Sequence, residues 1–165
     1  LSPLLVGGGQ EMGRRSGTEN IVGAVGMAAA AAAALVDLEK GVWSRIEELR
    51  NILENSIEES FNETIFVGRG TKRLTNTSLI INAGWRGENQ VMQLDLAGYA
   101  VTAGSACSSG KAKGSAVLQS MGYDDEQSKS AIRVSLGVGT TIEDINGFVG
   151  AYCKEGKKFM SRRSA

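Results

Sequence analysis

Three groups of residues have the side-chain types and spacing to do chemistry, and the first centres on a cysteine. Cys107 stands among small and polar residues in the stretch 102–115, TAGSACSSGKAKGS. Free cysteines are usually buried, and nearby positive charge favours the nucleophilic thiolate of an accessible one. Lys111 and Lys113 supply such charge. The local sequence leaves two interpretations open, a nucleophilic or sulfur-carrying thiol and an incidental surface cysteine.

The second candidate is an arginine inside a stretch with strong β-propensity, residues 130–137, SAIRVSLG. Because side chains alternate along a strand, Arg133 is expected on the face opposite Ile132 and Val134. A guanidinium can bind a carboxylate through two parallel hydrogen bonds that fix its orientation. Arg133 is therefore either a carboxylate clamp or an ordinary strand arginine paired with a surface Asp or Glu.

The third candidate is the glycine-rich stretch 7–20, GGGQEMGRRSGTEN, which leads into a helix. Unpaired backbone amides at a helix start favour an anion, and Ser16 and Thr18 add hydroxyl donors. The stretch lacks the Lys-Ser/Thr ending of a nucleotide-binding phosphate loop. Ser16 and Glu19 also have capping-box spacing, so helix capping alone is the competing explanation.

Composition removes several classes of function. The 165 residues contain 18 Lys and Arg against 18 Asp and Glu, which points to neither a nucleic-acid nor a membrane partner. The absence of histidine excludes Cys–His and Ser–His pairs and the commonest metal ligand. Two cysteines, Cys107 and Cys153, make no disulfide framework and favour a cytoplasmic protein. The apolar run Ala24–Leu35 is expected to be too short to span a bilayer. Since the chain starts at Leu1, we expect a piece of a longer protein.

The pattern of elements predicts an α+β fold, with a small, mainly antiparallel sheet covered by helices. A long N-terminal helix, buried or at an interface, is expected to be interrupted near Gly41 and to continue to Phe61. Strands are expected at 64–68, 77–83, 99–104 and 130–137, and further helices at 88–98, 115–122 and 141–159.

Four stretches, in this order, together resemble the C-terminal part of the cysteine desulfurases, which belong to the class V aminotransferase-like, fold type I pyridoxal-phosphate enzymes. They are GGGQEMGRRSGTENIVG at 7–23, TAGSACSSG at 102–110, SAVLQSMG at 115–122 and IRVSLGVGTTIEDI at 132–145. The SACSSG form is similar to the group I desulfurases. The resemblance implies that residues 1–20 are a remnant of the large cofactor-binding domain. Residues 21–165 would then be a long connecting helix and the small C-terminal domain.

The resemblance also implies roles for the candidate residues. Cys107 would be the catalytic cysteine, which takes the sulfur of L-cysteine as a persulfide and leaves L-alanine. Arg133 would bind the α-carboxylate of the substrate. Thr18 would reach the phosphate of pyridoxal phosphate across the interface of a homodimer. The sulfur would pass to an acceptor protein or an iron–sulfur scaffold.

The sequence departs from the family pattern in two places. The lysine that binds the cofactor covalently is expected beside a histidine, and no lysine here lies in such a motif. The chain alone is therefore expected to be inactive. Gly114 stands where the family often has proline, which predicts a more flexible end to the cysteine loop. The alternatives are a cofactor-free sulfur-relay or interaction module that uses Cys107, and a related pyridoxal-phosphate lyase or transaminase.

Overall fold

The computed structural model describes residues 2–103 and 114–163. The chain divides into two compact units, residues 1–41 and residues 42–165. The sequence-based boundary at residue 20 separates a remnant of the large cofactor-binding domain from the rest of the chain. The division into compact units does not test this assignment, which stays a prediction.

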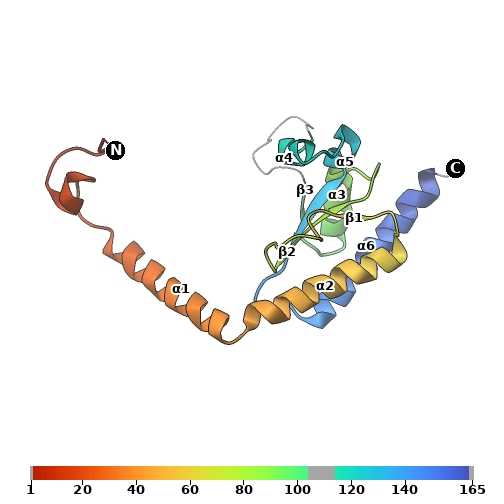
Figure 1. Ribbon diagram of the computed structural model, residues 1–165, viewed down its shortest axis with the longest axis horizontal. Coiled ribbons are helices and arrows are strands. Elements are labelled where there is room, and N and C mark those ends of the chain that lie inside the picture. Colours follow the sequence, from red (N-terminus) through yellow and green to blue (C-terminus); the bar gives the residue numbers. More distant parts are fainter. Residues whose placement is uncertain (1, 104–113, 164–165) are drawn as a thin grey trace. The chain divides into compact units, whose positions relative to one another are not determined.

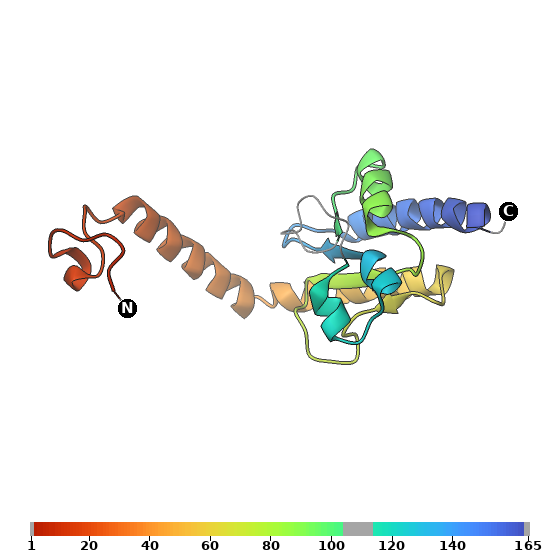
Figure 2. The ribbon, with the colours of Figure 1, turned by 90° about the horizontal axis from the view of Figure 1, so that it is seen from above.

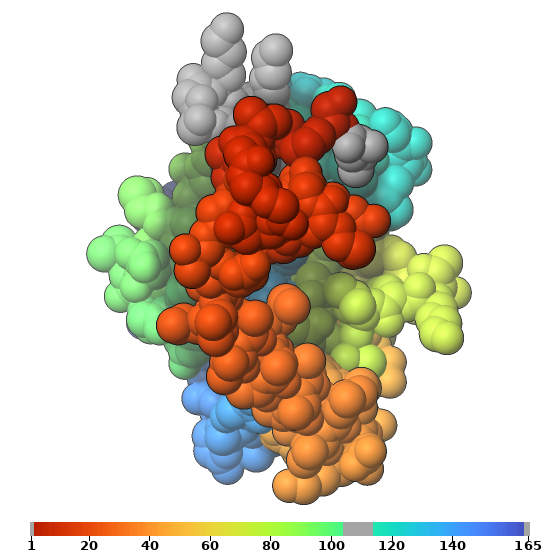
Figure 3. Space-filling view, turned by 90° about the vertical axis from the view of Figure 1, so that its left-hand side faces the viewer, coloured from red at the N-terminus to blue at the C-terminus, as the bar shows by residue number. Residues whose placement is uncertain are grey.

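The first unit is a glycine-rich loop followed by one helix, and Figure 3 shows both with their side chains in red and orange. The loop contains a short 3-10 turn, η1 (Gln10–Gly13). Helix α1 (Ile21–Glu39) starts at Asn20, whose side chain accepts a hydrogen bond of 3.0 Å from the Gly23 amide. The predicted capping box of Ser16 and Glu19 is therefore wrong. Ser16 instead donates to the Gly8 carbonyl at 3.0 Å and closes the loop on itself.

Helix α1 is longer than the predicted run Ala24–Leu35. It has 19 residues, and an 18-residue stretch of it has a mean hydropathy of 2.0, so by length and composition alone the helix could cross a membrane. The expectation that this segment is too short is thus corrected. None of the residues of α1 is buried within its own unit, so the predicted buried or interface position of this helix stays a prediction.

The second unit begins after Gly41, which ends the preceding helix. Gly41 has a φ of +69°, a conformation that residues with a Cβ rarely adopt. Helix α2 (Val42–Ser60) follows as a separate helix. The predicted interruption near this glycine is confirmed.

The sheet of the second unit has four strands in the order β1-β2-β4-β3, and every neighbouring pair is antiparallel. This confirms the predicted antiparallel sheet. The strands are β1 (Ile65–Phe66), β2 (Thr77–Ile81), β3 (Thr102–Ala103) and β4 (Ala131–Ser135). The central pair holds the longest register, from Thr77 opposite Ser135 to Ile81 opposite Ala131.

Helices cover one face of this sheet and form the main core with it. Helices α2 and α6 (Ile142–Arg163) lie side by side in Figures 1 and 2, and α3 (Gly87–Leu96) contacts α6. The apolar stripe of α2 is buried here together with Ile80, Ile132 and Val134 of the strands. An aromatic cluster completes the core, built from Phe61, Trp85, Phe148, Tyr152 and Phe159.

The opposite face is covered only in part, by two short helices. These are α4 (Ala116–Ser120) and α5 (Asp125–Lys129), and a smaller apolar cluster joins Leu118 of α4 to Ile81 and Ala131. Helix α5 is absent from the sequence-based prediction. Its signal is the capping box of Asp124 and Gln127, in which each side chain bonds the backbone of the other residue.

Candidate active site

Strand β4 places Arg133 on the part of the sheet that no helix covers. Its two neighbours, Ile132 and Val134, are 0% and 6% exposed in the core, whereas Arg133 is exposed. The predicted alternation is confirmed. The buried side chains on either side lock the strand, so the guanidinium must point away from the core.

The register of the strands identifies the neighbours of Arg133. Leu79 of β2 and Thr102 of β3 lie directly opposite it. Directly paired residues of antiparallel strands share a face, with Cβ atoms about 4.5–5.5 Å apart. We call the surface formed by Thr77, Leu79, Thr102, Arg133 and Ser135 the open sheet face. On this face the positive charge of Arg133 lies among three hydroxyl side chains and one leucine.

Arg133 has no acidic partner in its own unit. Every Asp and Glu of residues 42–165 lies among the described residues, and none forms an ion pair with Arg133. The interpretation as an ordinary paired surface arginine thus loses its main support. An unpaired, exposed guanidinium on a rigid strand suits a carboxylate ligand, because two parallel N–H donors match its two oxygens.

Thr18 lies in a turn that is held by its own neighbour. Arg15 donates from Nη1 to the carbonyls of Thr18 at 2.6 Å and Gly17 at 3.0 Å. The side chain of Thr18 is exposed, and its hydroxyl bonds no described residue. The turn therefore presents a free hydroxyl donor two residues before the cap of α1.

The first unit does not by itself enclose a phosphate pocket. A hollow of about 530 Å³ beside the start of α1 is lined by Glu11, Glu19 and apolar residues of the helix. Two carboxylates disfavour an anion there, and Thr18 is not in the lining. The contact of Thr18 with a phosphate across a dimer stays a prediction.

Cys107 falls outside the described residues, as do Lys111 and Lys113, but both neighbouring segments are described. Before it, Thr102 and Ala103 pair with β4. After it, a Cβ on Gly114 would lie 2.0 Å from Oγ and 3.1 Å from Cβ of Ser128. Gly114 therefore permits a close contact with α5, a better reason for glycine than the flexibility predicted from the sequence.

The described residues match only part of a pyridoxal-phosphate site. The hydroxyl of Thr18 suits a phosphate oxygen, and Arg133 suits the carboxylate of an amino acid. No described lysine is buried, and the half-buried Lys129 already bonds Asp125 at 2.6 Å. The described residues thus fit the phosphate and the substrate carboxylate, and none of them is assigned to the covalent bond of the cofactor.

Comparison with known proteins decides the family. The model of the aminotransferase class-V family matches residues 5–148. The chain belongs to this family. The match includes all of α1, so that apolar helix is part of the family's own sequence.

Individual family members of similar sequence carry a more specific name. The cysteine desulfurase IscS of Dictyoglomus turgidum is 36% identical over 146 residues, 88% of this chain and 37% of that protein. A cysteine desulfurase of Bradyrhizobium diazoefficiens is 40% identical over 92% of this chain and 38% of its own. The crystal structure of a NifS-like protein from Rickettsia africae superposes with a TM-score of 0.79 at 31% identity, covering 93% of this chain and 39% of that one.

These comparisons confirm the predicted family and fold type. They also show that the chain spans little more than a third of the length of these curated relatives. Sequence reasoning did not identify Thr102 and Leu79 as neighbours of Arg133. Their signal is the period-2 pattern of three strands, which becomes informative only when the register is known.

Proposed function

We propose that this chain is the C-terminal part of a cysteine desulfurase that converts L-cysteine to L-alanine and carries the sulfur on Cys107. The observation that carries the proposal is Arg133, which lies on the open sheet face opposite the strand that leads to Cys107 and forms no ion pair with a described residue. The cysteine desulfurase relatives at 36–40% identity support it.

In this proposal Arg133 binds and orients the substrate. Its two N–H donors hold the α-carboxylate, so the side chain of the bound cysteine has a fixed direction. The open sheet face leaves room for this contact because α4 and α5 cover only its other end.

Cys107 acts as the nucleophile toward the substrate sulfur. Its thiolate forms the new sulfur–sulfur bond, the carbon–sulfur bond of the substrate breaks, and the carbon takes up a proton to give alanine. One thiol and one cysteine give one persulfide and one alanine, so no outside oxidant is consumed. Transfer of that sulfur to an acceptor or iron–sulfur scaffold protein completes the cycle.

Pyridoxal phosphate, when bound, supplies the electron sink that makes the carbon–sulfur bond labile. We assign Thr18 to its phosphate across a homodimer. The remaining contacts of the cofactor, including its lysine, are assigned to no residue of this chain. We further place the protein in the cytoplasm, with no nucleic-acid or membrane partner.

A cofactor-free sulfur relay is the second candidate, because no described lysine is buried. Such a relay would accept a persulfide on Cys107 from a donor protein and would form no alanine. A related lyase or transaminase has no need of a thiol in the Cys107 loop.

The deciding experiment follows sulfur and carbon together. The complete enzyme is supplied with ³⁴S-labelled cysteine, and mass spectrometry measures label on each cysteine while alanine is quantified. The proposal predicts alanine together with label on Cys107, and the loss of that label in Cys107→Ser while bound cofactor remains. The matched control Cys153→Ser is expected to keep both. Label on Cys153, or label on Cys107 without alanine, would reject the desulfurase assignment.

A further inference from the structure

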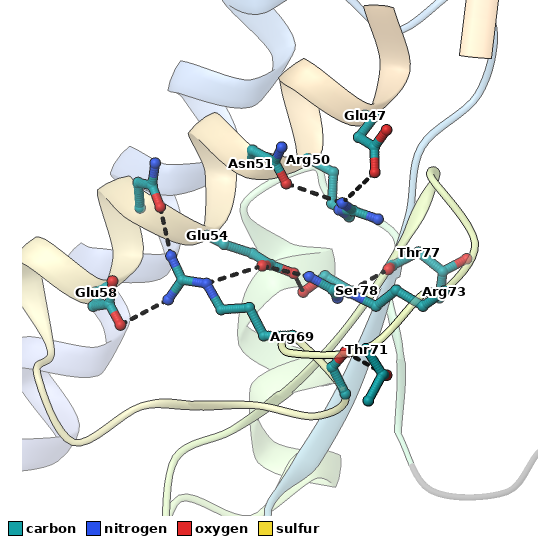
Figure 4. Close-up of polar contacts among 12 residues, drawn as sticks. Glu47, Arg50, Asn51, Glu54, Glu58, Arg69, Thr71, Arg73, Thr77 and Ser78 are labelled. Atoms are coloured by element: carbon teal, nitrogen blue, oxygen red, sulfur yellow. Dashed lines mark hydrogen bonds and ion pairs between the residues drawn. The ribbon is translucent and has the colours of Figure 1, made fainter. Parts of the chain in front are cut away.

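A second cluster of charged groups lies on the second unit, and Arg133 is not part of it. Helix α2 and the loop after β1 bring together Arg50, Arg69, Lys72 and Arg73 around a cleft of about 470 Å³. Figure 4 shows the arginines of this loop reaching toward the acidic side chains of α2. We call these four residues the cationic cleft.

One buried carboxylate lies behind the lining of the cationic cleft and pairs with two of its arginines. Glu54 is 1% exposed and accepts hydrogen bonds of 2.7 Å from Arg73 and 2.6 Å from Ser78. Burial would raise the pKa of Glu54, but the hydrogen bonds from Arg73 and Ser78 and the charges of Arg73 and Arg50 bring it below its ordinary value. Glu54 is therefore an anion at neutral pH, and it balances one of the cations.

The buried Arg50 and the half-buried Arg73 lie near that single buried anion, and Nε of Arg69 also pairs with it at 3.7 Å. The side chains of Arg50 and Arg73 are 6% and 16% exposed. Nε of Arg50 is buried and has no hydrogen-bond partner among the described residues. One positive charge at the base of the cleft thus remains without a buried counter-charge.

The other carboxylates near the cleft compensate weakly. Glu47 pairs with Arg50 at 3.0 Å and Glu58 pairs with Arg69 at 2.7 Å, but their side chains are 46% and 48% exposed. Exposed pairs of this kind contribute about 0–1 kcal/mol because water and salt screen them. Lys72 is exposed and has no ion pair with a described residue.

Neutral donors complete the lining of the cleft. Asn51 and Asn55 use their side-chain oxygens to accept from Arg50 and Arg69. Their NH₂ groups consequently remain as donors beside the cations. The lining is then rich in N–H groups, and Glu47 is its one acidic member.

We propose that the cationic cleft binds a phosphate-class oxyanion. Such a ligand brings at least two negative charges and several acceptor oxygens, which match two exposed cations, a buried excess of charge and two amide donors. A phosphate group and a free phosphate share this chemistry. The lining includes none of Arg133, Thr18 and Cys107, so the proposal does not depend on the desulfurase assignment.

Calorimetric titration of the 165-residue chain with inorganic phosphate and with pyrophosphate, at constant ionic strength, tests the site. We expect saturable binding of one anion per chain, tighter for pyrophosphate. Lys72→Ala should weaken it about tenfold, the scale of one charge-assisted contact. Glu47→Gln should tighten it, because a negative charge leaves the lining while the acceptor for Arg50 remains.

One control separates this site from general charge attraction. Lys157→Ala removes an exposed lysine of α6 and should leave the affinity unchanged. Arg69→Gln should weaken binding in a chain whose thermal unfolding is still cooperative. Equal losses in Lys72→Ala and Lys157→Ala, an absence of binding at millimolar pyrophosphate, or binding of a hexaglutamate peptide without binding of either phosphate would overturn the proposal.

Discussion

Arg133 of β4 lies directly opposite Thr102 of β3, on the face of the sheet that the helices leave open. This pairing places the proposed carboxylate clamp one strand away from the segment that leads to Cys107.

Replacing Arg133 with alanine in the complete enzyme should raise KM for L-cysteine about 10- to 150-fold. The reason is the loss of a charged, two-bond contact that contributes about 1.5–3 kcal/mol. Steady-state alanine formation measures the change. Arg86→Ala, which removes an exposed arginine from the turn before α3, is the matched control and should leave KM unchanged. Equal KM values for wild type and Arg133→Ala would show that Arg133 does not bind the substrate.

The 165-residue chain alone should not form a stable complex with pyridoxal phosphate, because no described lysine is buried in a pocket. Absorbance spectroscopy after gel filtration measures any retained cofactor. A visible band that survives gel filtration, and that disappears on substitution of one particular lysine, would show that this chain does contain the anchor.

Glu54 and Glu58 offer a matched pair on one helix for a test of stability. Glu54→Gln should lower the free energy of unfolding by about 3–5 kcal/mol, because it leaves buried arginines without their counter-charge. Glu58→Gln removes an exposed pair and should cost less than about 1 kcal/mol. Urea denaturation followed by tryptophan fluorescence compares them. Similar costs for both variants would mean that the charge of Glu54 is not what stabilises this part of the fold.

Acid should remove the contribution of Glu54 to the free energy of unfolding. Its pKa in the folded protein lies below its ordinary value of 4.5. The stabilisation is therefore fully present above the unfolded pKa and is lost as the pH falls through the folded pKa. The difference in unfolding free energy between wild type and Glu54→Gln, measured from pH 7 to pH 3, should shrink only below about pH 4.5. A difference that stays constant over this range would rule out this carboxylate as the titrating group.

Gly114→Ala should destabilise the second unit by about 1–3 kcal/mol, the usual cost of forcing extra volume into a packed site. The new Cβ would lie 2.0 Å from Oγ of Ser128, which donates to the Asp125 carbonyl at 3.0 Å. Adding Ser128→Ala removes that oxygen and should recover part of the loss. Thermal unfolding of the two single variants and the double variant measures the coupling. Additive effects would indicate that the two residues do not meet.

The sequence is a good guide wherever local pattern and burial agree. The antiparallel sheet, the outward side of Arg133 and the break at Gly41 follow from alternation and from a glycine with positive φ. It is a poor guide where a choice depends on contacts distant in sequence. Asn20 rather than Ser16 caps α1 because Ser16 bonds Gly8, and that contact has no periodic signal.

The charged side chains show the same limit. No spacing in the sequence distinguishes Glu54 from Glu58, although one is buried among arginines and the other faces water. Likewise, the sequence around Gly114 predicts a flexible hinge, whereas the structure shows that Ser128 leaves no space for a Cβ at this position. Residues whose role is set by an unrelated segment are therefore found only from the fold.

The alternation of β4 has a consequence for insertions and deletions. Because the side-chain period of a strand is two, gaining or losing one residue before Arg133 would turn the guanidinium into the helical layer and expel Ile132 to water. Such a change would disrupt the packing of the core and also remove Arg133 from its proposed contact with the carboxylate. Length variation in this region is consequently expected in the turns before and after β4 rather than within it, so β4 fixes the spacing between the core and the substrate contact.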